Sequence, residues 1–188
     1  MRQQARMQRK IWEISPRSPY TKTLAEKLKI TPIFAQVLLN RNLTEPSAAR
    51  AFLSPKLTDL VEPARLPGMS AAVERIRQAL EKDEKIVIYG DYDVDGISSV
   101  AILWHLIHLL GRKAEYYIPH RTDEGYGLNA EAIRLLAEAG TTLLITVDCG
   151  ITAAEEIALA KQLGMDVIIT DHHQPDVHLP DALAIVHT

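Results

Sequence analysis

The amino-acid sequence predicts an α/β protein in which helices flank a mainly parallel sheet, preceded by a small helical lead-in. Two observations predict this class. From residue 70 onward, short β-rich runs alternate with helical segments, and glycines end or nearly end the later helical segments. The expected strands are residues 85–89, 115–118, 143–147, 167–170 and 182–186. Strands that alternate with such helices are joined by right-handed crossovers, which gives a parallel sheet covered on both faces.

The lead-in spans residues 1–68 and is expected to be mostly helical. Thr31 followed by Pro32 has the chemistry of a helix start, and apolar residues at helical spacing continue the pattern to Asn40. A second short helix is expected to begin near Ser47. The prolines at positions 46, 55, 63 and 67 then predict a segment that runs over a surface and does not join a sheet.

A second domain, residues 69–188, contains the alternating pattern. The expected helices are residues 70–82, 97–110, 130–139 and 153–163. Gly111, Gly140 and Gly164 lie at the ends of the last three, where glycine commonly terminates a helix. A chain of 188 residues is long enough for this domain with its own core and for the smaller lead-in.

Charge is unevenly distributed along the chain, whose formal net charge is −3. Residues 1–17 hold five basic side chains and one acidic one, a net +4, which leaves −7 for the remainder. This basic lead could contact nucleic-acid phosphates or could be a solvated tail. The single cysteine, Cys149, excludes an internal disulfide and fits a reducing cytoplasm. We see no signal peptide and no apolar run of membrane-spanning length, so we expect a cytoplasmic protein without a membrane partner.

Acidic side chains follow three of the predicted strands. The first strand runs into a segment that carries Asp91, Asp93 and Asp95, and the third runs into Asp148. The fourth runs into the triplet 171–173, an aspartate followed by two histidines. Ligands bind at the carboxyl ends of the strands in open parallel sheets, so the topology brings these groups to one rim.

Five carboxylates and two imidazoles on one rim predict a metal site. Crowded carboxylates repel and desolvate one another unless cations neutralise them. Mixed carboxylate and imidazole ligands suit Mn²⁺ best; Mg²⁺ is a poorer match for histidine, and Zn²⁺ or Fe²⁺ also remain open. The number of ligands exceeds what one hydrated ion needs. We therefore expect two divalent ions that share a bridging aspartate, an arrangement typical of phosphoesterases.

Each segment also has a simpler interpretation. The Asp-x-Asp-x-Asp-Gly run is part of a calcium-loop pattern, but that pattern requires a glutamate where this chain has Ile102. Thr152 and Glu155 after the second acidic segment form a helix-capping pattern, and the two histidines alone suit an exposed loop. The occurrence of all three segments at successive strand ends favours the metal site.

These segments resemble the RecJ branch of the DHH phosphoesterase superfamily, which is named for the triplet at 171–173. The resemblance continues through the helical lead-in, including Trp12. The small oligonucleotide phosphodiesterases of the superfamily lack this lead-in. The matching segments are residues 39–43, 51–55, 66–69, 88–99, 125–129, 146–151 and 170–173.

The resemblance implies a role for each residue of the rim. The implied metal ligands are Asp91, Asp93, Asp95, Asp148 and His172, with Asp148 in the bridging position. The implied catalytic residues are Asp148, as the bridging ligand, and His173, which would contact the scissile phosphate. Asp171 would orient an imidazole.

Three further residues are candidates for holding a phosphate group. Ser98 and Ser99 are expected to begin a helix whose N-terminus faces the rim. Arg121 precedes a glycine-rich loop at residues 125–127 and either contacts phosphate or lies on the surface.

By resemblance, the chain is expected to be part of a metal-dependent 5′-to-3′ exonuclease that hydrolyses single-stranded DNA in repair and recombination. Its partners would be single-stranded DNA and repair or single-strand-binding proteins. Members of this family continue well beyond the triplet, with a fourth acidic ligand, a DHHA1 domain and an OB-fold. We therefore expect weak metal binding and little activity from these 188 residues alone. The alternatives are a phosphodiesterase for short oligoribonucleotides or cyclic dinucleotides, and a non-catalytic nucleic-acid-binding module.

Overall fold

A computed structural model describes residues 13–188, which divide into two compact units, one ending at Leu60 and one spanning Val61–Thr188. Trp12 and most of the basic lead lie outside the described residues. The predicted division into domains at residue 68 stays a prediction. In the part of the chain that the structure describes, no helix has both the length and the apolar character needed to cross a bilayer.

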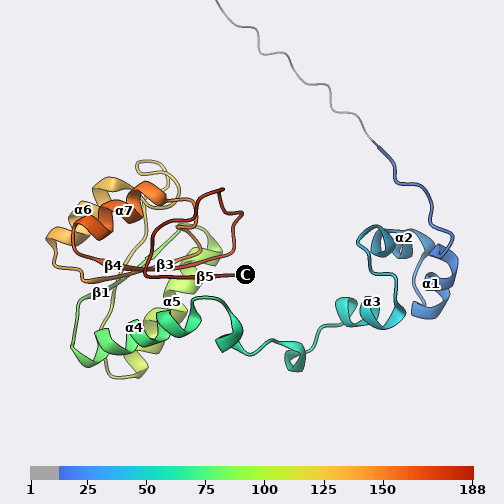
Figure 1. Ribbon diagram of the computed structural model, residues 1–188, viewed down its shortest axis with the longest axis horizontal. Coiled ribbons are helices and arrows are strands. Elements are labelled where there is room, and N and C mark those ends of the chain that lie inside the picture. The colour runs from blue at the N-terminus through green and yellow to red at the C-terminus, as the bar shows by residue number, and fades with distance from the viewer. Residues whose placement is uncertain (1–12) are drawn as a thin grey trace, which may run out of the picture. The chain divides into compact units, whose positions relative to one another are not determined.

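The first unit is a small cluster of helices, drawn in blue and cyan in Figure 1. Its helices are α1 (Thr21–Leu28), α2 (Pro32–Asn40) and α3 (Pro46–Leu53), followed by the short 3-10 helix η1 (Leu57–Asp59). Leu24, Ala35, Leu38 and Ala49 form its buried core. Thr31 caps α2 as predicted, because its side chain accepts a hydrogen bond from the Phe34 backbone N–H.

The second unit alternates helices and strands, as predicted. Its elements are η2 (Pro63–Arg65), α4 (Met69–Glu81), β1 (Ile86–Gly90), α5 (Val94–Leu109), β2 (Glu115–Tyr117), α6 (Ala130–Glu138), β3 (Leu143–Val147), α7 (Ala154–Gln162), β4 (Asp166–Asp171) and β5 (Ala184–His187). The predicted α/β class with a mainly parallel sheet is confirmed, because all five strands pair in parallel in the order β2-β1-β3-β4-β5.

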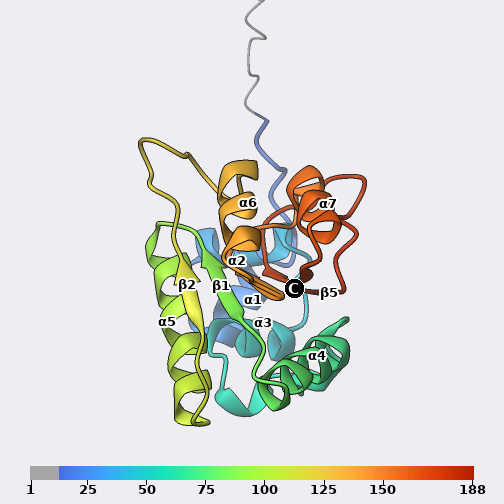
Figure 2. The same cartoon turned by 90° about the vertical axis from the view of Figure 1, so that its left-hand side faces the viewer.

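Helices cover both faces of this sheet (Figures 1 and 2). On one face, Ile88 and Ile145 pack in a cluster that includes Val100 and Ile107 of α5 together with residues of α4. On the other face, Tyr89 packs in a cluster with buried residues of α6 and α7. Every residue of the central strands β1 and β3 is buried, as expected for parallel strands that are covered on both faces.

The strand order places a topological switch point between β1 and β3. The chain leaves β1 through α5 toward β2 at one side, and α6 then leads to β3 on the other side of β1. Helices α5 and α6 therefore lie on opposite faces of the sheet, and the switch point lies at the carboxyl ends of β1 and β3. In open parallel sheets this is where ligands bind.

The predicted start of the helix at 97–110 is wrong. Helix α5 begins at Val94, because the Asp93 side chain accepts hydrogen bonds from the backbone N–H groups of Asp95 and Gly96. Ser98 and Ser99 therefore lie inside α5 and do not begin it. Helix α7 begins at Ala154, one residue after its predicted start, and has no side-chain cap, so the alternative capping pattern of Thr152 and Glu155 does not form.

Candidate metal centre

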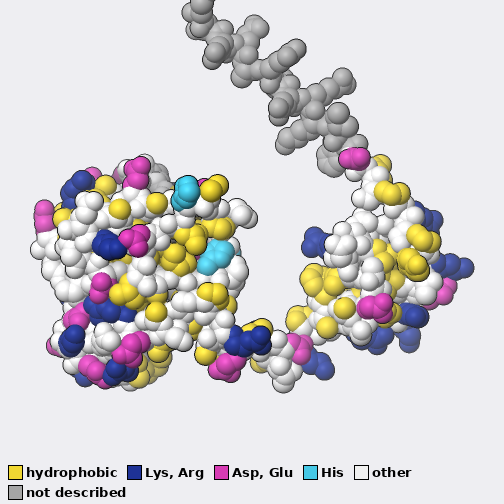
Figure 3. Space-filling model, viewed as in Figure 1, with side chains coloured by type: hydrophobic (Ala, Val, Ile, Leu, Met, Phe, Trp, Pro, Cys, Tyr) yellow, Lys and Arg dark blue, Asp and Glu magenta, His cyan; other side chains and the backbone are white. Residues whose placement is uncertain are grey.

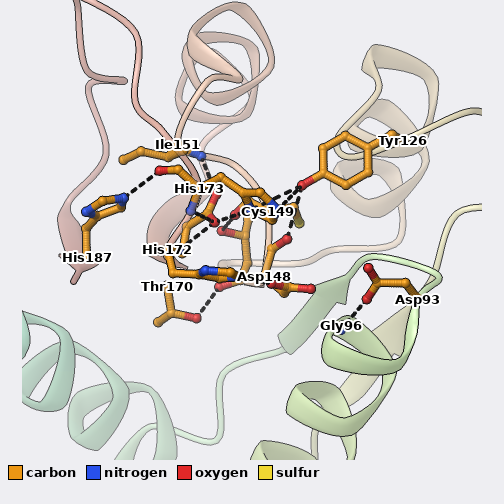
Figure 4. A network of polar contacts seen from close by, with 12 residues as sticks. Asp93, Gly96, Tyr126, Asp148, Cys149, Ile151, Thr170, His172, His173 and His187 are labelled. Atoms are coloured by element: carbon orange, nitrogen blue, oxygen red, sulfur yellow. Dashed lines mark hydrogen bonds and ion pairs between the residues drawn. The ribbon is translucent and has the colours of Figure 1, made fainter. Parts of the chain in front are cut away.

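Three side chains meet at the carboxyl ends of β3 and β4 (Figure 4). Asp148 follows β3, and the two histidines follow β4. Ligand atoms of Asp148, His172 and His173 all lie within 4.8 Å of one another. His172 Nε2 is 3.0 Å from Asp148 Oδ1. The Asp148 side chain is buried, whereas 60% of the His172 side chain is exposed, so the cluster has a dry base and an open side.

The backbone of Asp148 is strained. Its φ of +60° lies in the left-handed region, which is uncommon for a residue with a side chain. Its N–H donates to the Thr170 carbonyl at 2.9 Å, which extends the pairing of β3 with β4 by one residue. The chain then turns at Gly150, where a Cβ atom would lie 2.8 Å from Thr146 Oγ1. The turn thus holds the carboxylate of Asp148 at the edge of the sheet.

Asp171 organises the loop that carries the two histidines. Its Oδ1 accepts the backbone N–H groups of His172 at 2.7 Å and of His173 at 3.0 Å, and its Oδ2 accepts that of Ile151 at 3.0 Å. Oδ1 also lies 2.7 Å from His173 Nδ1. Burial acts to raise the pKa of Asp171, but these hydrogen bonds outweigh it and the pKa is lowered. Asp171 therefore stays ionised and orients His173.

Asp93 lies beside the cluster, at the start of α5 (Figure 4). The Gly96 backbone N–H is the largest cause of its lowered pKa, and a contact with Asp148 and the charge of His173 also contribute. The pKa of Asp148 is raised, first by burial and then by the negative charge of Asp93. The two carboxylates are thus close enough to repel each other, which is the situation that a shared cation relieves.

Asp91 and Asp95 lie outside the three-residue group. Asp91 is 1% exposed, and its Oδ1 has no hydrogen-bond partner among the described residues. Asp95 is exposed in the first turn of α5. Within residues 13–188, no lysine or arginine forms an ion pair with any of the five aspartates predicted for the rim. An orphaned buried oxygen beside uncompensated carboxylates fits a site for divalent cations.

The predicted phosphate-binding residues have different environments. Ser98 is exposed and Ser99 is half-buried, both in α5. The Arg121 guanidinium lies over the ring of Tyr92, with its carbon 5.3 Å from the ring centroid. Tyr92 directly follows Asp91, so this contact holds a cation beside the acidic segment. The phosphate-binding roles of all three residues stay predictions.

Tyr126 was not predicted as a site residue, but its hydroxyl lies at the cluster. It donates to the Asp148 carbonyl at 3.4 Å and lies 3.3 Å from His173 Nδ1. Its ring makes edge contacts with His173 and with Tyr92. A tyrosine between Gly125 and Gly127, both with positive φ, was the available signal for a side chain held in a tight loop.

His187 was also missed. It lies in β5, opposite Asp171 in the strand register, and its Nε2 is 2.7 Å from the His173 carbonyl. This contact ties the last strand to the loop of the two histidines. It directly follows the predicted strand 182–186, so the rule that singled out the other strand ends could have found it.

A cluster of carboxylates and imidazoles at the switch point of a parallel α/β sheet defines a class of divalent-metal-binding α/β domain. Residues 85–188 match the DHH family, N-terminal domain, and the chain belongs to this family. The matched range contains β1 through β5 and every residue of the cluster.

Curated relatives are single-stranded-DNA-specific exonucleases named RecJ. The protein from Bacillus subtilis is 48% identical over 94% of this chain, and that from Thermus thermophilus is 39% identical over 64%. The chain spans only 22% and 18% of these relatives. A solved structure of exonuclease RecJ bound to manganese aligns with a TM-score of 0.63 at 38% identity, covering 68% of this chain and 33% of the other. The Mn²⁺ complex of Thermus thermophilus RecJ aligns with a TM-score of 0.62 at 30% identity, covering 89% and 23%.

Proposed function

We propose that the chain forms the metal-binding part of a divalent-metal-dependent nuclease that hydrolyses phosphodiesters of single-stranded DNA. The observation that carries the proposal is the meeting of Asp148, His172 and His173 within 4.8 Å at the switch point of the sheet. The names of the relatives supply the substrate class. We extend the proposal to 5′-to-3′ polarity, to repair and recombination, and to a cytoplasmic location.

Two divalent ions would lie at the carboxyl ends of β1, β3 and β4, with Mn²⁺ preferred because imidazole and carboxylate ligands are mixed. Asp148 and His172 would hold them together with Asp91, Asp93 and Asp95. Such ions lower the pKa of a coordinated water and neutralise charge on the leaving oxygen. The solved relatives that contain manganese support the choice of metal.

The chain's own side chains position the phosphate. Asp171 binds Nδ1 of His173, and the Tyr126 hydroxyl lies 3.4 Å from Nε2, where a phosphate oxygen would replace it as the partner of the imidazole. The ring of Tyr126 packs edge-on against the same imidazole and limits its rotation. Arg121, Ser98 and Ser99 would bind the remaining phosphate oxygens. In this proposal Asp148 and His173 are the catalytic residues, because they touch the metals and the scissile phosphate respectively.

A chimera tests the proposal at full length. This chain replaces the matching 177-residue stretch of the Bacillus subtilis relative, which is 48% identical to it. Release of mononucleotides from 5′-labelled single-stranded DNA in Mn²⁺ is expected, with none in EDTA. A folded chimera that leaves the DNA intact while the parent relative degrades it would contradict the proposal. Short oligoribonucleotides and cyclic dinucleotides, assayed in parallel, test the substrate class.

A further inference from the structure

The two units of the chain carry opposite charge. Residues 1–60 hold eleven basic and four acidic side chains, a net +7, whereas residues 61–188 hold ten basic and twenty acidic ones, a net −10. A strand of nucleic acid that approaches the second unit therefore meets a repulsive field outside the metal centre. Attraction for its phosphates has to come from elsewhere.

The basic side chains of the first unit are available for such a partner. All seven lysines and arginines among residues 13–60 are exposed, and none of them forms an ion pair with a described residue. In the second unit, five of the ten are paired with carboxylates. Figure 3 shows dark blue side chains around the first unit on this face. Internal ion pairs thus do not neutralise the basic side chains among residues 13–60.

A hollow in the first unit collects part of this charge. It has a volume of about 680 Å³ beside α3 and η1, and its polar lining consists of Ser47, Arg50, Ser54, Lys56 and Asp59. The Arg50 guanidinium donates one hydrogen bond, to the Lys27 carbonyl at 3.2 Å, and has other N–H groups for a ligand. Asp59 Oδ2 accepts the Lys56 backbone N–H at 2.9 Å, so a local donor engages its charge.

We propose that this hollow is a second contact for the backbone of a single-stranded nucleic acid, in which Arg50 and Lys56 bind neighbouring phosphates. Cations and hydroxyls lining an open hollow bind phosphate oxygens without reading the base sequence. The proposal rests on the proposed function for its choice of substrate. It adds a binding surface on the first unit that holds the strand while the second unit acts on it.

The salt dependence of binding tests the proposal. Fluorescence anisotropy of a labelled oligothymidylate is measured against the 188-residue chain in EDTA, over a series of salt concentrations. Each phosphate contact on a single strand contributes about 0.7 to the slope of log K against log salt concentration. The double variant R50Q/K56Q is expected to lower the slope by about 1.4, and K56Q alone, whose side chain makes no internal ion pair, by about 0.7.

A matched control uses two exposed, unpaired cations of the second unit, Lys113 and Arg134. The double variant K113Q/R134Q makes the same change of charge and is expected to leave the slope unchanged. Equal slopes for R50Q/K56Q and the unaltered chain, or an equal loss in both double variants, would overturn the proposal. Because EDTA removes metal-dependent hydrolysis, an inactive chimera would not affect this result, and a retained slope would not affect the nuclease proposal.

Discussion

Strand β4 has an aspartate at each end, and the two aspartates have different partners. Asp166 begins the strand, and its Oδ2 is 2.6 Å from the Arg75 guanidinium, which also binds Glu84 at 2.6 Å. Asp171 ends the strand, where it binds backbone N–H groups and His173. The amino edge of the sheet thus neutralises its acids with an arginine, and the carboxyl edge does not.

This difference separates a stabilising site from the proposed metal site. The ion pairs of Arg75 stabilise the fold because both carboxylates depend on a cation that the chain supplies. At the carboxyl edge, burial and Asp93 raise the pKa of Asp148, so its charge is unfavourable until something else compensates it. Replacement of Asp148 at the carboxyl edge and of Arg75 at the amino edge should therefore have opposite consequences for stability and activity.

The largest effect is expected from Asp148→Asn. In the chimera this change should lower Mn²⁺-dependent hydrolysis of single-stranded DNA more than about 100-fold, since even partners outside the metal ligands cost 10–100-fold. Without metal, its free energy of unfolding in urea should equal or exceed that of the parent chain, because a repelling charge is removed. Asp176→Asn, an exposed loop residue, serves as the control for both measurements. Nuclease activity near the parent level would remove Asp148 from the site.

Arg75→Met is expected to have the reverse effect. It leaves Glu84 and Asp166 without their cation and should lower the free energy of unfolding by about 2 kcal/mol, less than for fully buried pairs because Asp166 is 47% exposed. Arg77→Met is the control, because its carboxylate partners are about half exposed, and it should change stability by less than about 0.5 kcal/mol. An equal loss of unfolding free energy in the two variants would show that the ion pairs of Arg75 contribute no more than exposed ones.

Added Mn²⁺ should stabilise only chains with an intact carboxyl edge. A ligand at a hundred times its Kd raises the free energy of unfolding by about 2.7 kcal/mol. The midpoint temperature of thermal unfolding should therefore be higher in Mn²⁺ than in EDTA for the unaltered chain and for Arg75→Met. For Asp148→Asn the two midpoint temperatures should be equal. A shift that Asp148→Asn retains would place the ion elsewhere.

The smallest effect is expected from pH. Hydrogen bonding to Asp171 raises the pKa of His173 above its ordinary 6.5. In metal-free protein, the stability that this pair contributes is fully present below pH 6.5 and is lost as the pH rises through the raised pKa. Urea unfolding of the parent chain across this range should therefore show a decline that His173→Asn lacks. A rise in stability with pH would reverse the assigned direction of the pKa shift.

Local sequence signals predicted much of the fold. The apolar runs of β1 and β3, the cap of α2 by Thr31 and the α/β alternation were all readable because they depend on neighbours in the chain. Helix α1 was not located, since Tyr20 provides no side-chain cap and Lys29, not a glycine, adopts the left-handed conformation at its end. The start of α5 was misplaced because Asp93 serves as a helix cap as well as a candidate ligand.

The sequence by itself determined the parallel sheet and the positions of acidic residues at its strand ends, because strand periodicity and strand termini are local properties. Only the tertiary structure decided which of these residues meet: Asp148 with the two histidines, while Asp95 stays exposed in α5. It also decided that Tyr126 and His187 contact His173. Such contacts depend on strand order and on loop paths between residues far apart in the chain, which no local pattern encodes.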